Sequence, residues 1–199
     1  MLSQRMSKET DMKTLATTIF LWLTIAATHA AETSNHCRSV RDSLRQDFKS
    51  VIVTGNTIVY FVQSKKNQIS LDEGDPGDIS ITQAGHKIQI SSNKIIPLVV
   101  TVYFKDIYRI EATDHAQIRS LGKVNLRNLQ VILRDNAAGR IKANTTSLYT
   151  VTAGDSKLEL RGKTTEHFVL GNQNVNTRDF MASNTQRRDH SEMVARWEK

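Results

Sequence analysis

The chain has 199 residues, a formal net charge of +7, one cysteine and two prolines. This length suits one domain with flanking segments, and the single Cys37 excludes an internal disulfide. The basic residues are scattered and no nucleic-acid-binding motif accompanies them, so we expect no nucleic-acid partner.

Residues 1–30 have the pattern of a secretory signal peptide. Lys13 precedes an apolar run over residues 15–27, and small residues follow up to Ala30. The run is too short to span a bilayer comfortably, so it is read as a signal peptide rather than a membrane anchor. We therefore expect export, with cleavage after Ala30.

Residues 31–47 are a polar lead-in to the domain. Val40, Leu44 and Phe48 are spaced four apart, which allows one short helical turn. The neighbouring His36 and Cys37 have no further histidine or cysteine in range, and two adjacent ligands are too few to indicate a structural metal site. We therefore expect neither a metal nor a cofactor.

The domain begins at Phe48, and strand-like segments follow one another up to Phe104. Each segment alternates apolar and polar residues or is rich in β-branched and aromatic ones, which is typical of β-strands. Turns rich in Gly, Asn and Asp separate the segments, and both prolines lie between strands, where a missing N–H breaks no ladder. The segments read VIVT, TIVYFV, QISLD, DISITQ, HKIQISS and LVVTVYF.

The second half carries a loose repeat of short apolar segments, each followed by a polar turn. The anchors Ile110, Ile132, Val151 and Val169 lie 22, 19 and 18 residues apart. Strand-like repeats of about twenty residues indicate stacked β coils, in which each coil buries similar side chains on its neighbour. We therefore predict an all-β, single-domain, β-helix-like stack of short coils preceded by β-hairpins. The residues expected to point inward are Ile107, Ile110, Ile118, Leu121, Val124, Leu126, Leu129, Val131, Leu133, Ile141, Leu148, Val151, Leu158, Leu160, Phe168, Leu170 and Val175.

Residues 48–182 resemble the GIN head domain of the family known as "putative auto-transporter adhesin", which is found in exported bacterial proteins of unknown function. FKSVIVTGNTIVYFVQ is similar to the family's opening hairpin, and ISLDEGDPGDISITQAGHKIQISS is similar to its second strand pair. LVVTVYFKDIYRIEATDHAQIRS looks like its first coil, and VTAGDSKLELRGKTTEHFVLGNQNVNTRDFMA looks like the two coils that follow. The resemblance implies a β-helix-like domain outside the cytoplasm and brings no catalytic residues with it.

Motifs for enzyme chemistry are missing from the sequence. It has no P-loop, no GxGxxG and no GxSxG, so we expect no catalytic residues and no enzyme activity. Asp114, Asp135, Asp155 and Asn172 fall in equivalent turns of the repeat, where they are expected to stabilise the turn by local hydrogen bonds rather than bind Ca²⁺. The alternative is an enzyme acting on envelope polysaccharide, for which Glu111, Asp114 and Asp135 are the only local candidate carboxylates.

One group of basic residues follows similar turns in successive coils and is expected to align on one side. Such a row either attracts an anionic partner or is a solvated face that keeps the protein soluble. Together with the expected export, the family resemblance implies a binding or structural module in the periplasm or at the surface of a bacterium. Its partner would be an envelope lipid, an acidic glycan or another envelope protein. Residues 183–199 contain few apolar residues and are expected to be a polar, disordered tail. The candidate anion-binding residues are Arg119, Lys123, Arg140, Lys142, Arg161 and Lys163.

Overall fold

The computed structural model describes residues 47–171 and 174–188, so the expected signal peptide, nearly all of the lead-in and residues 189–199 lie outside it. The described part is all-β, as predicted, with one short 3₁₀ helix, η1 (Pro76–Asp78). It contains no helix that is long and apolar enough to cross a membrane. The strands are β1 (Ser50–Gly55), β2 (Thr57–Gln63), β3 (Gln68–Glu73), β4 (Ser80–Ala84), β5 (Lys87–Ser92), β6 (Leu98–Phe104), β7 (Arg109–Ala112), β8 (Gln117–Ser120), β9 (Val124–Leu133), β10 (Ala138–Thr152), β11 (Lys157–Gly171) and β12 (Val175–Arg188).

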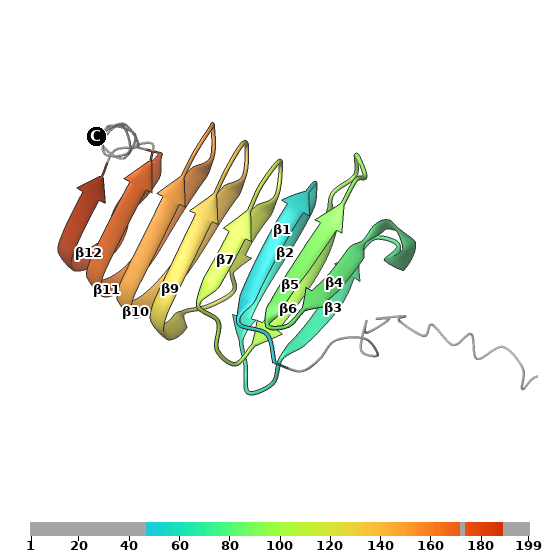
Figure 1. The fold of residues 1–199 in the computed structure, drawn as a ribbon, viewed down its shortest axis with the longest axis horizontal. Helices are drawn as coiled ribbons and strands as arrows, with labels where there is room; N and C mark the ends of the chain where they lie inside the picture. The colour runs from blue at the N-terminus through green and yellow to red at the C-terminus, as the bar shows by residue number, and fades with distance from the viewer. Residues whose placement is uncertain (1–46, 172–173, 189–199) are drawn as a thin grey trace, which may run out of the picture. The chain divides into compact units, whose positions relative to one another are not determined.

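The strands form the two walls of a stacked coil (Figure 1). Wall A consists of β4, β5, β1 and β7, followed by the later halves of β9 to β12. Wall B consists of β3, β6, β2 and β8, followed by the first parts of β9 to β12. Neighbouring strands are parallel, with two exceptions at one end of the stack: β3 is antiparallel to β6, and β4 is antiparallel to β5. The predicted β-helix-like stack is thus confirmed.

The opening segment is not a hairpin, contrary to the expectation from sequence. Strand β1 pairs with β5 and β7 in wall A, whereas β2 pairs with β6 and β8 in wall B. Gly55 makes the bend between the walls with a φ of 76°. A Cβ atom there would lie 1.9 Å from the carbonyl oxygen of Ser92 in the adjacent coil, so only glycine fits. Two strands joined by a tight turn look alike in sequence, whether they pair with each other or with adjacent coils.

Pairing between coils decides which residues of the repeat enter the core. Ile110, Val131, Thr150 and Val169 occupy one column along wall A, and all four are buried. The anchors Ile132 and Val151 therefore belong to the next column, whose side chains point away from the core, although Ile132 is still buried at 6% exposure. The four anchors thus do not form a single column, because a shift of one residue turns a side chain to the opposite face.

The prediction is wrong for four of the residues that were expected to point inward. Leu121 is 52% exposed in a turn, and Val151, Phe168 and Leu170 are half-buried on the outer surface of wall A. The other thirteen are buried in the core.

Strand β12 continues to Arg188, so the first part of the expected polar tail at 183–199 is a strand in the structure. Residues 184–188 pair in register with residues 166–170 of β11. The last strand of a stack is held by backbone pairing to a single neighbour, and this pairing needs little apolar content.

Candidate anion-binding face

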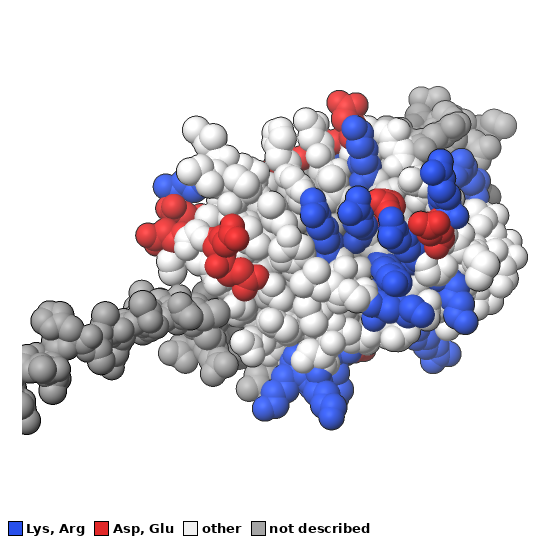
Figure 2. Space-filling model, turned by 180° about the vertical axis from the view of Figure 1, so that it is seen from behind, with Lys and Arg blue, Asp and Glu red and all other residues white. Residues whose placement is uncertain are grey.

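The six predicted cations lie on the outer surface of wall B. Side chains alternate along each strand, so the buried residues Ile118, Ile141 and Leu160 leave their neighbours pointing outward. Figure 2, which views the molecule from behind, shows Lys and Arg side chains gathered over this part of the surface with few Asp or Glu among them. All six cations are exposed, and they come from β8 (Arg119), the turn before β9 (Lys123), β10 (Arg140, Lys142) and β11 (Arg161, Lys163).

The parallel register brings cations from distant parts of the sequence side by side. Arg119 pairs with Arg140, and Lys142 pairs with Arg161. Neighbouring strands are about 4.8 Å apart, so each pair places two positive charges close together. Lys163, in contrast, stands beside Asn144 rather than beside another cation.

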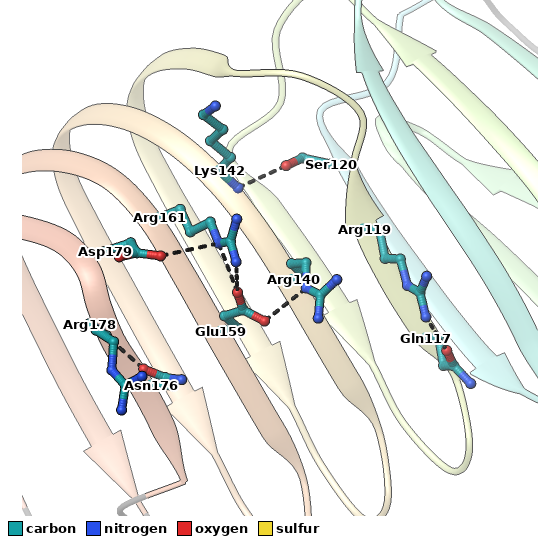
Figure 3. Close-up of polar contacts among 10 residues, drawn as sticks. All are labelled: Gln117, Arg119, Ser120, Arg140, Lys142, Glu159, Arg161, Asn176, Arg178 and Asp179. Carbon is teal, nitrogen blue, oxygen red and sulfur yellow. Dashed lines mark hydrogen bonds and ion pairs between the residues drawn. The ribbon is translucent and has the colours of Figure 1, made fainter.

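Two carboxylates neutralise part of this charge (Figure 3). Glu159 lies between Arg140 and Arg161 and forms an ion pair of 2.8 Å with each. The hydrogen bond from Arg140 and that from Arg161 hold the pKa of Glu159 below its usual range. Asp179 lies 3.7 Å from Arg161. Within the described residues, Lys123, Lys142 and Lys163 have no ion pair with a carboxylate, so their charges stay available to a ligand.

Three further exposed cations belong to the same surface and are missing from the prediction. Lys157 begins β11, Arg178 lies on β12, and Arg127 lies where the chain bends from wall B to wall A. Lys157 lies in the row next to that of Arg119 and Arg140, so extending the repeat spacing to that row would have predicted it. We call the outer surface of the part of wall B formed by β8 and the first parts of β9 to β12 the basic face. Its charged residues are nine cations (Arg119, Lys123, Arg127, Arg140, Lys142, Lys157, Arg161, Lys163 and Arg178) and the carboxylates Glu159 and Asp179.

Two shallow clefts open on the basic face. The turn-side cleft, of about 510 Å³, is bordered by Arg119, Arg140 and Lys157 and contains Glu159. The corner cleft, of about 730 Å³, lies where the chain bends between the walls, and its charged lining residues are Arg127 and Lys163. Neither cleft holds two facing carboxylates, which a glycosidase would need.

The carboxylates considered for the enzyme alternative have structural partners. Glu111 is buried and forms ion pairs with Arg109 and Arg134. Asp114 accepts a hydrogen bond from the backbone N–H of Gly55 at 3.0 Å, and Asp135 accepts one from the N–H of Asp114 at 3.3 Å. These two aspartates therefore connect the turns of successive coils, rather than making the local hydrogen bonds within one turn that the sequence suggested.

The turn positions need one correction. Asp114 and Asp135 have φ values of 58° and 57°, and Gly154, with 65°, occupies the equivalent position in the following coil. Asp155 is thus one residue out of line, and Asn172 lies outside the described residues. Within the described part, no three His, Cys, Asp or Glu side chains form a group that could hold a metal ion.

Stacked parallel coils with an exposed basic wall define an all-β domain of the β-helix type. The family model described as "Putative auto-transporter adhesin, head GIN domain" matches residues 47–189, and the chain belongs to this family. A comparison with curated proteins found no match.

Solved structures share the fold at low sequence identity. A "putative adhesin" from Parabacteroides merdae is 11% identical, with a TM-score of 0.51 over 73% of this chain and 74% of the other. A "putative lipid binding protein" from Parabacteroides distasonis is 10% identical, with a TM-score of 0.51 over 73% of this chain and 76% of the other. At these identities the likeness concerns the fold alone.

Proposed function

We propose that this chain is a non-enzymatic binding module of the bacterial cell envelope that holds an anionic partner on its basic face. In this proposal a signal peptide at residues 1–30 directs export to the periplasm or cell surface and is cleaved near Ala30. Membership of a family described as an adhesin head supports a role outside the cytoplasm. The partner is an envelope lipid, an acidic glycan or an acidic surface of another envelope protein.

The proposal rests on the excess of positive charge on the basic face. The basic face has nine cations against two carboxylates, and both carboxylates contact Arg161. Like charges on a rigid sheet repel one another, and an anionic ligand relieves this repulsion. Lys123, Lys142 and Lys163 are the best placed to contact a ligand, since no carboxylate of the described residues pairs with them.

An enzyme acting on envelope polysaccharide is less well supported. Glycoside hydrolysis uses two carboxyl groups that flank the scissile bond. Glu111 is engaged by two arginines, and Asp114 and Asp135 accept backbone hydrogen bonds in the turns. None of the three lines either cleft of the basic face.

A charge-reversal experiment tests the proposal. Arg119, Lys142 and Lys163 are changed together to Glu, because Arg140 and Arg161 also hold Glu159 and their replacement would disturb the fold. Binding of the mature protein to lipopolysaccharide, to polygalacturonate and to phosphatidylglycerol vesicles is measured at low and high salt. Vesicles are included because one relative in fold is described as lipid binding.

The matched control reverses Lys65, Lys66 and Lys105, which are exposed and lie outside the basic face. The control should bind like the wild type, and the Arg119, Lys142 and Lys163 variant should lose most binding. Wild-type binding should also fall at high salt, because the distance beyond which exposed charges are screened, about 8 Å at physiological ionic strength, becomes shorter as salt is added. Equal binding by both variants, or no binding by the wild type to any of the three probes, would refute the proposal.

A further inference from the structure

The corner cleft is a groove bordered by two columns of outward side chains. One border is the column Asn125, Asn144, Lys163 and Met181, which the register places side by side on four successive strands. The other border follows two residues later on each strand and includes Arg127, Thr146 and Thr165.

Residues between the two borders form the floor of the groove. Leu126 is 8% exposed and Thr164 is 5% exposed, so the floor is closed by the core. Thr145 donates a hydrogen bond to Thr164 at 2.9 Å, which fixes the floor between coils. The groove is therefore shaped before any ligand arrives, which lowers the entropy that binding must overcome.

The lining combines neutral hydrogen-bonding groups with two cations. Asn144 donates an amide hydrogen to the side-chain oxygen of Asn125 at 3.3 Å. Within the described residues, this arrangement leaves the Nδ2 donors of Asn125 and the Oδ1 acceptor of Asn144 without a hydrogen-bond partner, so they can exchange hydrogen bonds with a ligand. Thr146 and Thr165 add hydroxyl groups, while Lys163 and Arg127 add positive charge.

A hydroxyl-rich anion matches this combination better than a lipid headgroup does. Amides and hydroxyls exchange hydrogen bonds with sugar hydroxyls, and the two cations pair with carboxylate or phosphate substituents. Met181 is 71% exposed at the end of one border and offers an apolar contact for the C–H face of a sugar ring. A flat bilayer surface, in contrast, contacts the rims of a groove and leaves its recessed groups unused.

We propose that the corner cleft is a binding site for a segment of acidic glycan that lies along the groove and across successive coils. This inference rests on the proposed function, because the glycan is the anionic partner of the basic face. It adds a site with sugar selectivity to a surface that otherwise attracts any polyanion.

The test separates sugar recognition from charge. In one variant Asn125 and Asn144 are both changed to Ala, and in a second Thr146 and Thr165 are both changed to Val, so neither variant alters the net charge. The control changes Asn93 and Asn136, which are exposed and lie outside the cleft, to Ala. Binding to polygalacturonate, inorganic polyphosphate and phosphatidylglycerol vesicles is measured for each, after thermal melts establish that each is folded.

We expect each cleft variant to bind polygalacturonate about tenfold more weakly, since two hydrogen bonds are lost. Binding to polyphosphate, which has no sugar hydroxyls, should stay unchanged, and the control should match the wild type. Unchanged polygalacturonate binding in both cleft variants would overturn the glycan site and leave the proposed function intact. Wild-type binding to vesicles but not to polygalacturonate would assign the face to a membrane instead. A wild type that binds none of these probes and no lipopolysaccharide would overturn the proposed function as well.

Discussion

Replacing the same residue type at two positions tests the register of the stack. Val131 is fully buried in the inward column, whereas Val151 is half-buried on the outer surface of wall A. Val131→Asp removes an apolar side chain from the core, which costs about 2 kcal/mol. The new carboxyl group must also stay neutral at pH 7, and a pKa raised by about three units adds about 4 kcal/mol. Val151→Asp should cost only about 1 kcal/mol, the usual range of strand propensity at a partly exposed position.

Urea unfolding and thermal melts of the two variants at pH 7 measure this difference. A loss of about 6 kcal/mol lowers the melting temperature by more than about 12 °C in a domain of this size, whereas 1 kcal/mol lowers it by about 2 to 4 °C. Val131→Asp should also lose less stability near pH 4, where its carboxyl group is protonated at less cost. If Val151→Asp proved as harmful as Val131→Asp, the assignment of the two columns would be wrong.

Three further predictions concern single residues. Gly162→Ala should destabilise the fold by more than about 2 kcal/mol in urea unfolding, because Gly162 has a φ of 106° and a Cβ there would lie 2.1 Å from the carbonyl oxygen of Ala143; a variant as stable as the wild type would contradict this. Burial lowers the pKa of His167 to about 4, so the unfolded chain takes up a proton more readily than the folded one. Stability should be complete above pH 6.5 and fall by up to about 3 kcal/mol as the pH drops towards 4; unfolding at pH 7, 5 and 4 should show this slope, and His167→Leu should flatten it. Asp135→Ala should lower the free energy of unfolding by about 1 kcal/mol, because the N–H of Asp114 loses its acceptor and alanine tolerates a φ of 57° poorly. Asp135→Gly should restore part of this stability, because glycine adopts a positive φ without strain. Equal stability of the Ala and Gly variants would contradict the contribution assigned to the left-handed backbone.

Local chemistry made much of the fold predictable from sequence. Alternating β-branched residues and turn residues indicate strands of the correct type, and the spacing of about twenty residues indicates coils. The aspartates at 114 and 135 could be assigned to turns because a short polar side chain tolerates left-handed backbone. These are properties of a residue and its neighbours along the chain.

Pairing between coils could be read only from the tertiary structure. Wall A carries apolar residues on both of its surfaces, so Val151 and Thr150 are equally plausible core residues until the pairing of Thr150 with Val131 is known. The same holds for the opening strands β1 and β2, which resemble a hairpin but pair with other coils.

For the basic face, too, the sequence determines some features and the tertiary structure determines others. Alternation within one strand makes Arg140 and Lys142 outward neighbours once Ile141 is buried, and sequence alone establishes this. Sequence cannot show that Glu159 lies between Arg140 and Arg161, or that Asn125 and Lys163 border one groove. Residues about twenty apart become neighbours only when the backbone hydrogen bonds between coils choose one register, and a shift of a single residue would have put different side chains on this face.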